Sequence, residues 1–160
     1  RRLQIMTIFA ATIILIFPLF AWWYTPSSEP LSLRLILLLI PPILLGATYL
    51  FKVEWYGLDE EKITVKRVIG KVELKLSEID KIEVQPFATN RSLRVAGNGG
   101  LFGFNGWFRS QHLGLYRAFV THSAKTIIIY MGERKVVISP GKPKAFVRDV
   151  KSRLKTTNPS

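Results

Sequence analysis

The sequence contains no cysteine and only two histidines. Without cysteine there is neither a disulfide framework nor a cysteine-ligated metal site. The histidines, His112 and His122, do not belong to a cluster with metal-ligand spacing, and neither has a nucleophile at a meaningful distance along the chain. We therefore expect no catalytic residues, no metal site and no cofactor, and an enzyme is only a remote alternative.

Charge is also scarce, but only in the first third of the chain. Residues 1–51 contain three basic side chains and one acidic side chain. Residues 52–83 are almost balanced, with seven basic and eight acidic residues, whereas residues 84–160 carry thirteen basic against two acidic residues. The C-terminal half therefore supplies most of the net charge of +12. It either faces something acidic or keeps a membrane-bound protein on the cytosolic side.

The uncharged region consists of two hydrophobic runs. The first, 3–24, has 22 residues and spans about 33 Å as a helix, enough for a hydrocarbon core of ~30 Å. The second, 35–51, reaches back to residue 33 if Arg34 snorkels toward the headgroups. The sequence thus predicts transmembrane helices at about 3–24 and 33–51, forming an anchor over 1–54. A signal peptide is the alternative for the first run, although no small-residue cleavage site follows it.

The prolines and the flanking basic residues predict the shape and the orientation of these helices. Pro41 and Pro42 lie in the middle of the second run and predict a kinked helix, with a re-entrant hairpin as the alternative. Arg1 and Arg2 precede the first run, and basic residues follow the second from Lys52 onward. The positive-inside rule then places both termini in the cytoplasm. We expect a multi-pass protein of the cell membrane whose remaining domain, 55–160, is cytoplasmic.

After residue 52 the hydrophobic period changes to two. Ile63 and Val65 alternate with polar residues, and the same alternation returns in 72–76 and 82–84. Gly70 marks a tight connection, and the motif at 77–80, Ser-Glu-Ile-Asp, predicts a capping box with one helical turn. Further strands are predicted at 113–121, 125–131 and 135–139. At least six short strands indicate a barrel or sandwich.

One amphipathic helix is predicted at the C-terminus, with Pro143 at its first position. Its apolar stripe, expected to plug the sheet, consists of Phe146, Val147, Val150 and Leu154. A basic stripe lies about 110–120° away. Its members, candidate contacts for an anionic ligand, are Lys144, Arg148, Lys151 and Lys155. This stripe is either a solvated face or a surface for anionic headgroups.

The segment 97–108 is rich in glycine and also contains four aromatic residues, Phe102, Phe104, Trp107 and Phe108. It matches neither a dinucleotide fingerprint nor a P-loop. It is either a glycine-kinked strand pair with core aromatics or an aromatic loop that touches the bilayer or a partner. Strand alternation places Phe102 and Phe104 on one face and Trp107 on the other. Phe104 is expected in the core, whereas Trp107 and Phe108 are the candidate contacts.

Four arginines surround this segment, namely Arg91, Arg94, Arg109 and Arg117. Guanidinium groups match the geometry of phosphate and carboxylate, so these are candidate contacts for an anionic headgroup or an acidic peptide. Scattered surface arginines are the alternative. No nucleic-acid-binding motif is recognisable, and we expect no nucleic acid partner.

Several segments, in this order, resemble the bacterial pleckstrin-homology-like (PH-like) membrane proteins. They are the two hydrophobic runs, Leu76-Ser77-Glu78-Ile79, the stretch 97–108, Gly114-Leu115-Tyr116 with Phe119-Val120-Thr121, and Val137-Ile138-Ser139-Pro140 leading to Phe146. The likeness covers roughly residues 55–154 and the anchor. It implies a seven-stranded, strongly bent β-barrel capped by a C-terminal helix, and a binding or scaffolding role. The basic lipid-binding loop of eukaryotic relatives has no counterpart at 68–71.

The sequence therefore predicts a membrane-anchored PH-like module. Besides the lipid bilayer, its expected partner is a membrane protein or a second copy of the chain. The alternative is binding of anionic lipid headgroups through the basic C-terminal half.

Overall fold

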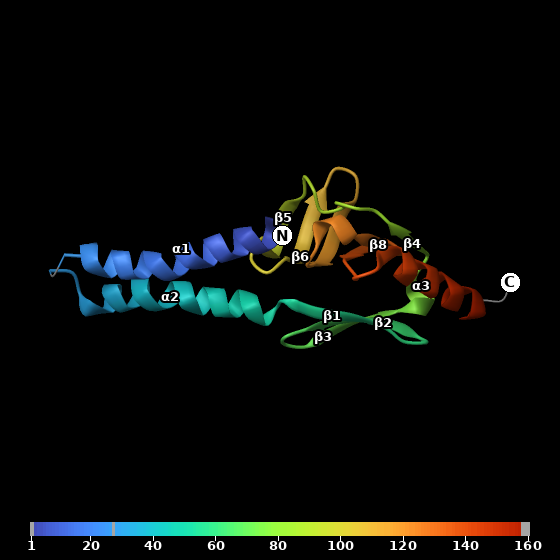
Figure 1. Cartoon of the computed structure of the whole chain (residues 1–160), viewed down its shortest axis with the longest axis horizontal. Coiled ribbons are helices and arrows are strands. Elements are labelled where there is room, and N and C mark those ends of the chain that lie inside the picture. Colours follow the sequence, from blue (N-terminus) through green and yellow to red (C-terminus); the bar gives the residue numbers. More distant parts are fainter. Residues whose placement is uncertain (1, 27, 158–160) are drawn as a thin grey trace.

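The computed structural model describes residues 2–26 and 28–157, and of residues 2–7, 10 and 155–157 it describes the backbone only. Within this part of the chain there are three α-helices and nine β-strands. Two helices form a long antiparallel hairpin at one end of the molecule, the strands form two sheets, and the third helix lies at the opposite end (Figure 1). The β-sheets and the single C-terminal helix agree with the expected mainly-β domain.

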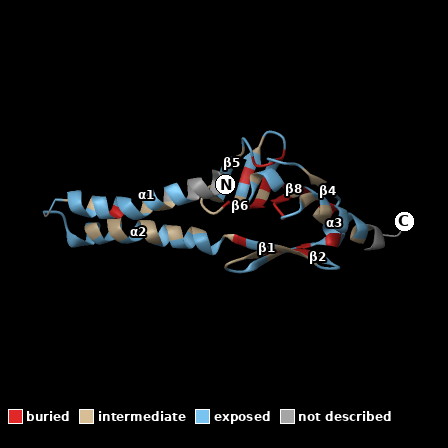
Figure 2. Cartoon of the chain, viewed as in Figure 1, coloured by how far each residue is buried: buried red, intermediate tan, exposed pale blue. Residues whose placement is uncertain are grey.

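The helical hairpin consists of α1 (Arg2–Tyr24) and α2 (Leu31–Leu50). Most of its described side chains are both apolar and exposed (Figure 2). Among the described residues, one helix, Leu31–Leu50, is long and apolar enough to cross a membrane, and Ala11–Tyr24 is a shorter apolar helix.

The prolines do not interrupt these helices. Pro18 lies inside α1, Pro41 and Pro42 lie inside α2, and Ile40 before them is helical. The re-entrant hairpin considered for this segment is therefore not formed. A helix can tolerate the lost backbone donors when it packs against a neighbour, as α2 packs against α1.

Arg34, which the sequence predicts to snorkel toward the headgroups, reaches the turn that joins α1 to α2. Its Nη2 donates to the carbonyl oxygen of Thr25 at 3.1 Å and to that of Pro26, and its guanidinium lies 5.9 Å from the ring centroid of Trp22. Carbonyls beyond the last turn of a helix lack intrahelical partners and lie at the negative end of the helix dipole. Arg34 therefore fastens the turn between α1 and α2.

The first sheet is an antiparallel meander of β1 (Val53–Leu58), β2 (Lys62–Arg67) and β3 (Lys71–Lys75). The sequence predicts β2 and β3 but not β1, which starts just before the expected domain boundary at 54/55. Gly70 closes the β2–β3 turn with a φ of +74°, a conformation that glycine adopts without a steric penalty.

The second sheet has the strand order β4-β8-β9-β7-β6-β5. Its strands are β4 (Lys81–Val84), β5 (Leu93–Gly99), β6 (Phe104–Ser110), β7 (Gly114–Val120), β8 (Ile127–Met131) and β9 (Arg134–Ile138). Neighbouring strands in this sheet are antiparallel, except that β7 and β9 run parallel. Strand β9 reaches its place beside β7 by the hairpin that joins it to β8. The described strands thus form two sheets, where the resemblance implies one seven-stranded barrel.

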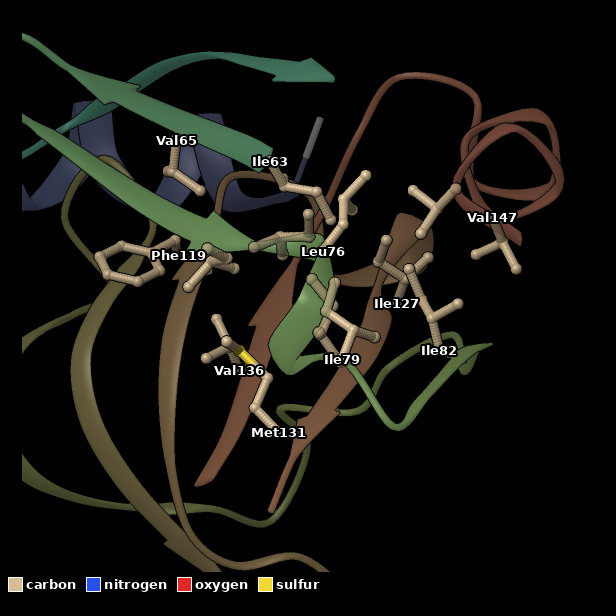
Figure 3. Packing of buried hydrophobic residues seen from close by; sticks show 14 of the residues in the cluster. Ile63, Val65, Leu76, Ile79, Ile82, Phe119, Ile127, Met131, Val136 and Val147 are labelled. Atoms are coloured by element: carbon tan, nitrogen blue, oxygen red, sulfur yellow. The ribbon is translucent and has the colours of Figure 1, made fainter. Parts of the chain in front are cut away.

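The main hydrophobic core lies between the two sheets. Ile63 and Val65 of β2 and Phe119 of β7 are fully buried in it (Figure 3). The C-terminal helix α3 (Pro143–Thr157) closes the core with Val147 and Val150, which confirms the apolar stripe predicted for this helix.

A second core covers the other face of the six-stranded sheet. Phe108 and Tyr116 are its largest buried side chains. The segment 85–92, which connects β4 to β5, contributes the buried Ala88 to this core, and the Tyr116 hydroxyl donates to Ser92 Oγ at 2.7 Å. Both faces of this sheet are therefore packed near its centre.

The predicted helical turn after β3 is present, but the predicted capping box is wrong. The turn is a 3-10 helix over Leu76–Glu78, and its N-cap residue Lys75 makes no side-chain cap hydrogen bond. Leu76 is fully buried and sets the start of the turn, so Ser77 lies inside the turn and not at its N-cap.

Candidate functional site

An apolar surface is exposed on strands β5, β6 and β7. Leu93 is 76% exposed, Trp107 41% and Leu115 50%. Arg109 of β6 pairs with Leu93 on one side and with Leu115 on the other. Paired residues, and residues two apart on one strand, point to the same face of a sheet. Leu93, Trp107, Arg109 and Leu115 therefore form one surface, called here the β5–β7 face.

Strand β5 is the outer strand of the sheet beside this face. In the described part of the chain it pairs only with β6, so its other edge offers unpaired N–H and C=O groups. Val95 on β5 is exposed, and the register with β6 shifts between Arg94 and Ala96. A free edge next to an apolar face suits an extended segment of another chain.

Trp107 and Phe108, the two predicted contact residues, lie on opposite faces of β6. Phe108 is 1% exposed, and its ring centroid lies 5.7 Å from that of Phe104 and 6.1 Å from that of Tyr116. Phe108 is thus a core residue and not the contact that the sequence predicts, because neighbours on a strand alternate between faces. Phe104 is partly buried against the same core, as expected. A contact role for Trp107 stays a prediction.

The four predicted arginines do not form one cluster. Arg91 and Arg109 line a surface hollow of about 650 Å³ together with His112. Arg94 pairs with Phe108 across the strands and so belongs to the other face of the sheet.

The fourth of them, Arg117, shares its face of β7 with the buried Phe119. The guanidinium of Arg117 is 4.9 Å from the ring centroid of Phe119 and 5.9 Å from that of Trp107. Burial lowers the pKa of Arg117, and the positive charge of Arg67 lowers it further. The Nε of Arg67 is buried without a hydrogen-bond partner among the described residues, and its guanidinium lies 5.6 Å from the ring centroid of Phe51.

The basic stripe of α3 lies elsewhere. Lys144, Arg148 and Lys151 are exposed and line a shallow hollow of about 470 Å³, whereas the side chain of Lys155 lies outside the described residues. Helix α3 is at the end of the domain opposite the α1–α2 hairpin (Figure 1). This stripe and the arginines of β5–β7 are therefore separate surfaces.

Two loops of the β domain meet the C-terminal end of α2. In the β2–β3 turn, the N–H of Val68 donates to the Lys52 carbonyl at 3.0 Å and that of Ile69 to the Leu50 carbonyl at 2.9 Å. The bond to Leu50 satisfies one of the carbonyls that the end of α2 leaves without a partner. The sequence gives no signal for this contact, because it joins residues that no local pattern relates.

The glycine-rich β5–β6 turn is the second loop at this end. The Phe102 ring is 5.4 Å from that of Tyr49 in an edge-to-face arrangement, and Asn105 Nδ2 donates to the Phe51 carbonyl. Phe102 has a φ of +58° and lies in the turn, outside strand β6. The prediction that Phe102 and Phe104 share a strand face is therefore wrong.

A groove of about 530 Å³ runs between β1 and the start of α3 and includes His122. Behind it, the Tyr56 hydroxyl donates to the Phe119 carbonyl at 2.8 Å and lies 3.0 Å from Ser139 Oγ. Burial raises the pKa of Tyr56. These bonds join the two sheets, and they give the hydroxyls of Tyr56 and Ser139 a structural role. Within residues 2–26 and 28–157, no group of three or more His, Cys, Asp or Glu is placed to hold a metal ion.

Comparison with known proteins adds one match. The family model described as "Bacterial PH domain" matches residues 55–154, which is more than half of the chain. No curated protein and no solved structure matches the sequence.

Proposed function

The chain belongs to the bacterial PH domain family, and we propose that it is a non-catalytic binding module, anchored in the cell membrane, that engages a membrane protein partner. Both termini and the β domain lie on the cytoplasmic side. PH-like domains are typically binding modules, which supports the absence of catalysis. The observation that carries the proposal is the exposed β5–β7 face beside the free edge of β5.

The helical hairpin supports the anchor. Exposed apolar side chains cover both helices, including Phe9 and Phe17 on α1 and Ile36 and Ile43 on α2. An apolar surface of this extent is unfavourable in water and is stable in a hydrocarbon environment. Basic residues at the domain end of both helices favour the cytoplasmic side for the β domain.

Cysteine labelling tests the orientation, because the chain contains no cysteine of its own. We expect Ser28→Cys, in the turn between α1 and α2, to react with a membrane-impermeant maleimide added to intact cells. Ser77→Cys, exposed in the β domain, should react only after permeabilisation. Labelling of both positions from the same side would rule out two spans with a cytoplasmic domain.

The chemistry of the β5–β7 face favours a partner segment that is extended, apolar and acidic. Leu93, Trp107 and Leu115 offer apolar contacts, the β5 edge offers backbone hydrogen bonds, and Arg109 with Arg91 beside it offers positive charge. A second copy would bring its own strongly basic half against this one, and like charges in an interface are unfavourable. A different membrane protein with acidic residues therefore fits better than self-association.

Site-specific photo-crosslinking in native membranes tests the partner. With a benzoylphenylalanine at Leu115, we expect one heterologous adduct, and Trp107→Ala should reduce its yield several-fold. The same probe at Lys144 on α3 is the matched control, because that position is also exposed and lies at the other end of the domain. Equal adducts at Leu115 and Lys144, or an adduct only between two copies of the chain, would count against the proposal.

The basic stripe of α3 is a weaker candidate for anionic lipid. A bilayer that surrounds α1 and α2 lies at the other end of the molecule from α3 (Figure 1). Electrostatic attraction between exposed charges fades over about 8–10 Å at physiological salt. Lys144, Arg148 and Lys151 are therefore better explained as a solvated face.

A further inference from the structure

A surface hollow lies at one end of the β5–β7 face. Its volume is about 650 Å³, and Leu93 and Arg109 of that face line it together with Arg91, His112 and other polar residues. Leu93 is the first residue of β5, whereas the other end of β5 leads into the glycine-rich turn that contacts α2. This hollow, called here the β5 hollow, therefore opens onto the apolar face at the end of β5 that is remote from α2.

The β5 hollow carries positive charge and no carboxylate. Arg91 and Arg109 are exposed, and neither is in an ion pair among the described residues. Between Glu83 and Glu133 the sequence has five basic residues and no acidic residue. Strands β5, β6 and β7 lie entirely within that interval. Nothing in these strands or their turns can neutralise the two guanidinium groups, so an acidic group of another molecule is the complementary ligand.

Arg91 is held in a backbone conformation that arginine rarely adopts. Its φ is +55°, in the left-handed region, which costs a residue with a Cβ about 1–2 kcal/mol. The residues on both sides of it are fixed. The N–H of Asn90 donates to the Phe87 carbonyl at 2.9 Å, and Ser92 Oγ accepts from the Tyr116 hydroxyl at 2.7 Å. A strained residue that its surroundings hold in place is typical of a binding site, and the fixed turn lowers the entropy that binding would cost.

We propose that the β5 hollow binds an aspartate or glutamate side chain of the partner segment, while the rest of that segment pairs along the edge of β5. Arg91 and Arg109 donate to the carboxylate, and Leu93 and Trp107 contact the neighbouring apolar residues. A protein segment fits better than a lipid headgroup, because a headgroup would leave the unpaired N–H and C=O groups of β5 unused. This inference rests on the proposed function and adds where the segment carries its acidic residue.

Selection from a random heptapeptide library displayed on phage tests the hollow, with the full chain in a neutral detergent as the bait. We expect the selected peptides to be enriched in aspartate or glutamate next to alternating apolar residues. Selection on Arg91→Gln or Arg109→Gln should keep the apolar residues and lose the acidic ones. Arg148→Gln on α3 is the matched control, because it removes an exposed arginine at the other end of the domain and should keep both.

Calorimetry with one selected peptide tests whether the contact is direct. Replacing its acidic residue by the corresponding amide should weaken binding about tenfold, as expected for lost hydrogen bonds to a charged group. The same replacement should have little further effect on binding to Arg91→Gln or Arg109→Gln, because partners in one contact are not additive. Arg109→Glu should prefer a peptide with lysine in place of the acidic residue. Full additivity, or no reversal of preference, would contradict the proposed contact.

Arg91→Gly separates a binding role from a packing role. Glycine adopts a positive φ without a steric penalty, so the melting temperature of this variant should equal or exceed that of the unmodified chain. Its affinity for the acidic peptide should still fall about tenfold, as for a lost charged contact. A lower melting temperature with an unchanged peptide affinity would assign Arg91 to packing and contradict the proposal.

The outcomes distinguish this inference from the proposed function. Selected peptides without acidic residues, or an acidic enrichment that Arg91→Gln and Arg109→Gln leave unchanged, would overturn the inference. So would a failure to select any peptide, and binding of dihexanoyl-phosphatidylglycerol that both variants abolish would then assign the hollow to a lipid headgroup. The crosslink from Leu115 in native membranes decides the proposed function by itself, so the two can fail separately.

Discussion

Phe108→Ala is expected to lower the free energy of unfolding by about 3–5 kcal/mol, as truncation of a buried aromatic residue does. Phe108 is 1% exposed, and its ring contacts those of Phe104 and Tyr116 in the second core. The segment 85–92 covers this core, so the surrounding residues cannot collapse freely into the space left by the ring. A domain with a typical stability of ~5–15 kcal/mol would lose a large part of it. Thermal melting of the full chain in detergent measures the effect.

Trp107→Ala is the matched control, because it truncates the adjacent aromatic residue on the same strand. Trp107 is 41% exposed and points to the other face of β6, so its removal leaves no closed cavity. We expect a much smaller drop in melting temperature together with weaker crosslinking to the partner. A large stability loss for Trp107→Ala and none for Phe108→Ala would mean that the faces of β6 are assigned the wrong way round.

Gly106→Ala is expected to disrupt the β5–β6 hairpin. Gly106 has a φ of +144°, and an added Cβ would lie 2.2 Å from the Ala96 carbonyl oxygen and 2.8 Å from the Cα of Gly97 on the paired strand. Both obstacles are backbone atoms, which cannot move aside without shifting β5. Combining about 1–3 kcal/mol for the strained backbone with about 1–3 kcal/mol for overpacking gives a loss of about 2–6 kcal/mol.

Hydrogen exchange locates this effect, and Gly114→Ala provides the control. Gly114 also has a positive φ, +67°, but an added Cβ would meet nothing within 4 Å. We expect it to cost only about 1–2 kcal/mol, the penalty of a left-handed residue. Gly106→Ala should speed amide exchange in β5 and β6 selectively. Equal exchange and equal melting in the two variants would show that the close approach of the strands does not matter.

Elements with a strong local pattern were predictable from the sequence. Strand β2 follows from the alternation around Ile63 and Val65, and β3 follows from the alternation over 72–76. The stripe of Val147 and Val150 gives α3 its buried face. The two apolar runs and their polar link give the helical hairpin. In each case the periodicity of neighbouring residues selects the element, and burial of one face stabilises it. The same alternation put Trp107 on an exposed face, but it did not reveal that Phe108 is covered.

Only the tertiary structure decided which segments meet. The parallel pairing of β7 with β9, the docking of the glycine-rich turn on α2, and the hydrogen bond from Tyr56 to the Phe119 carbonyl all join residues far apart in the chain. Phe102 escaped the strand pattern because a positive φ put it into the turn that contacts Tyr49. Periodicity assigns a side chain to a face of its own strand, but it does not say which strand lies opposite. The sequence could therefore indicate that Arg117 belongs to a basic region, whereas the fold was needed to show that it is half-buried against the rings of Trp107 and Phe119.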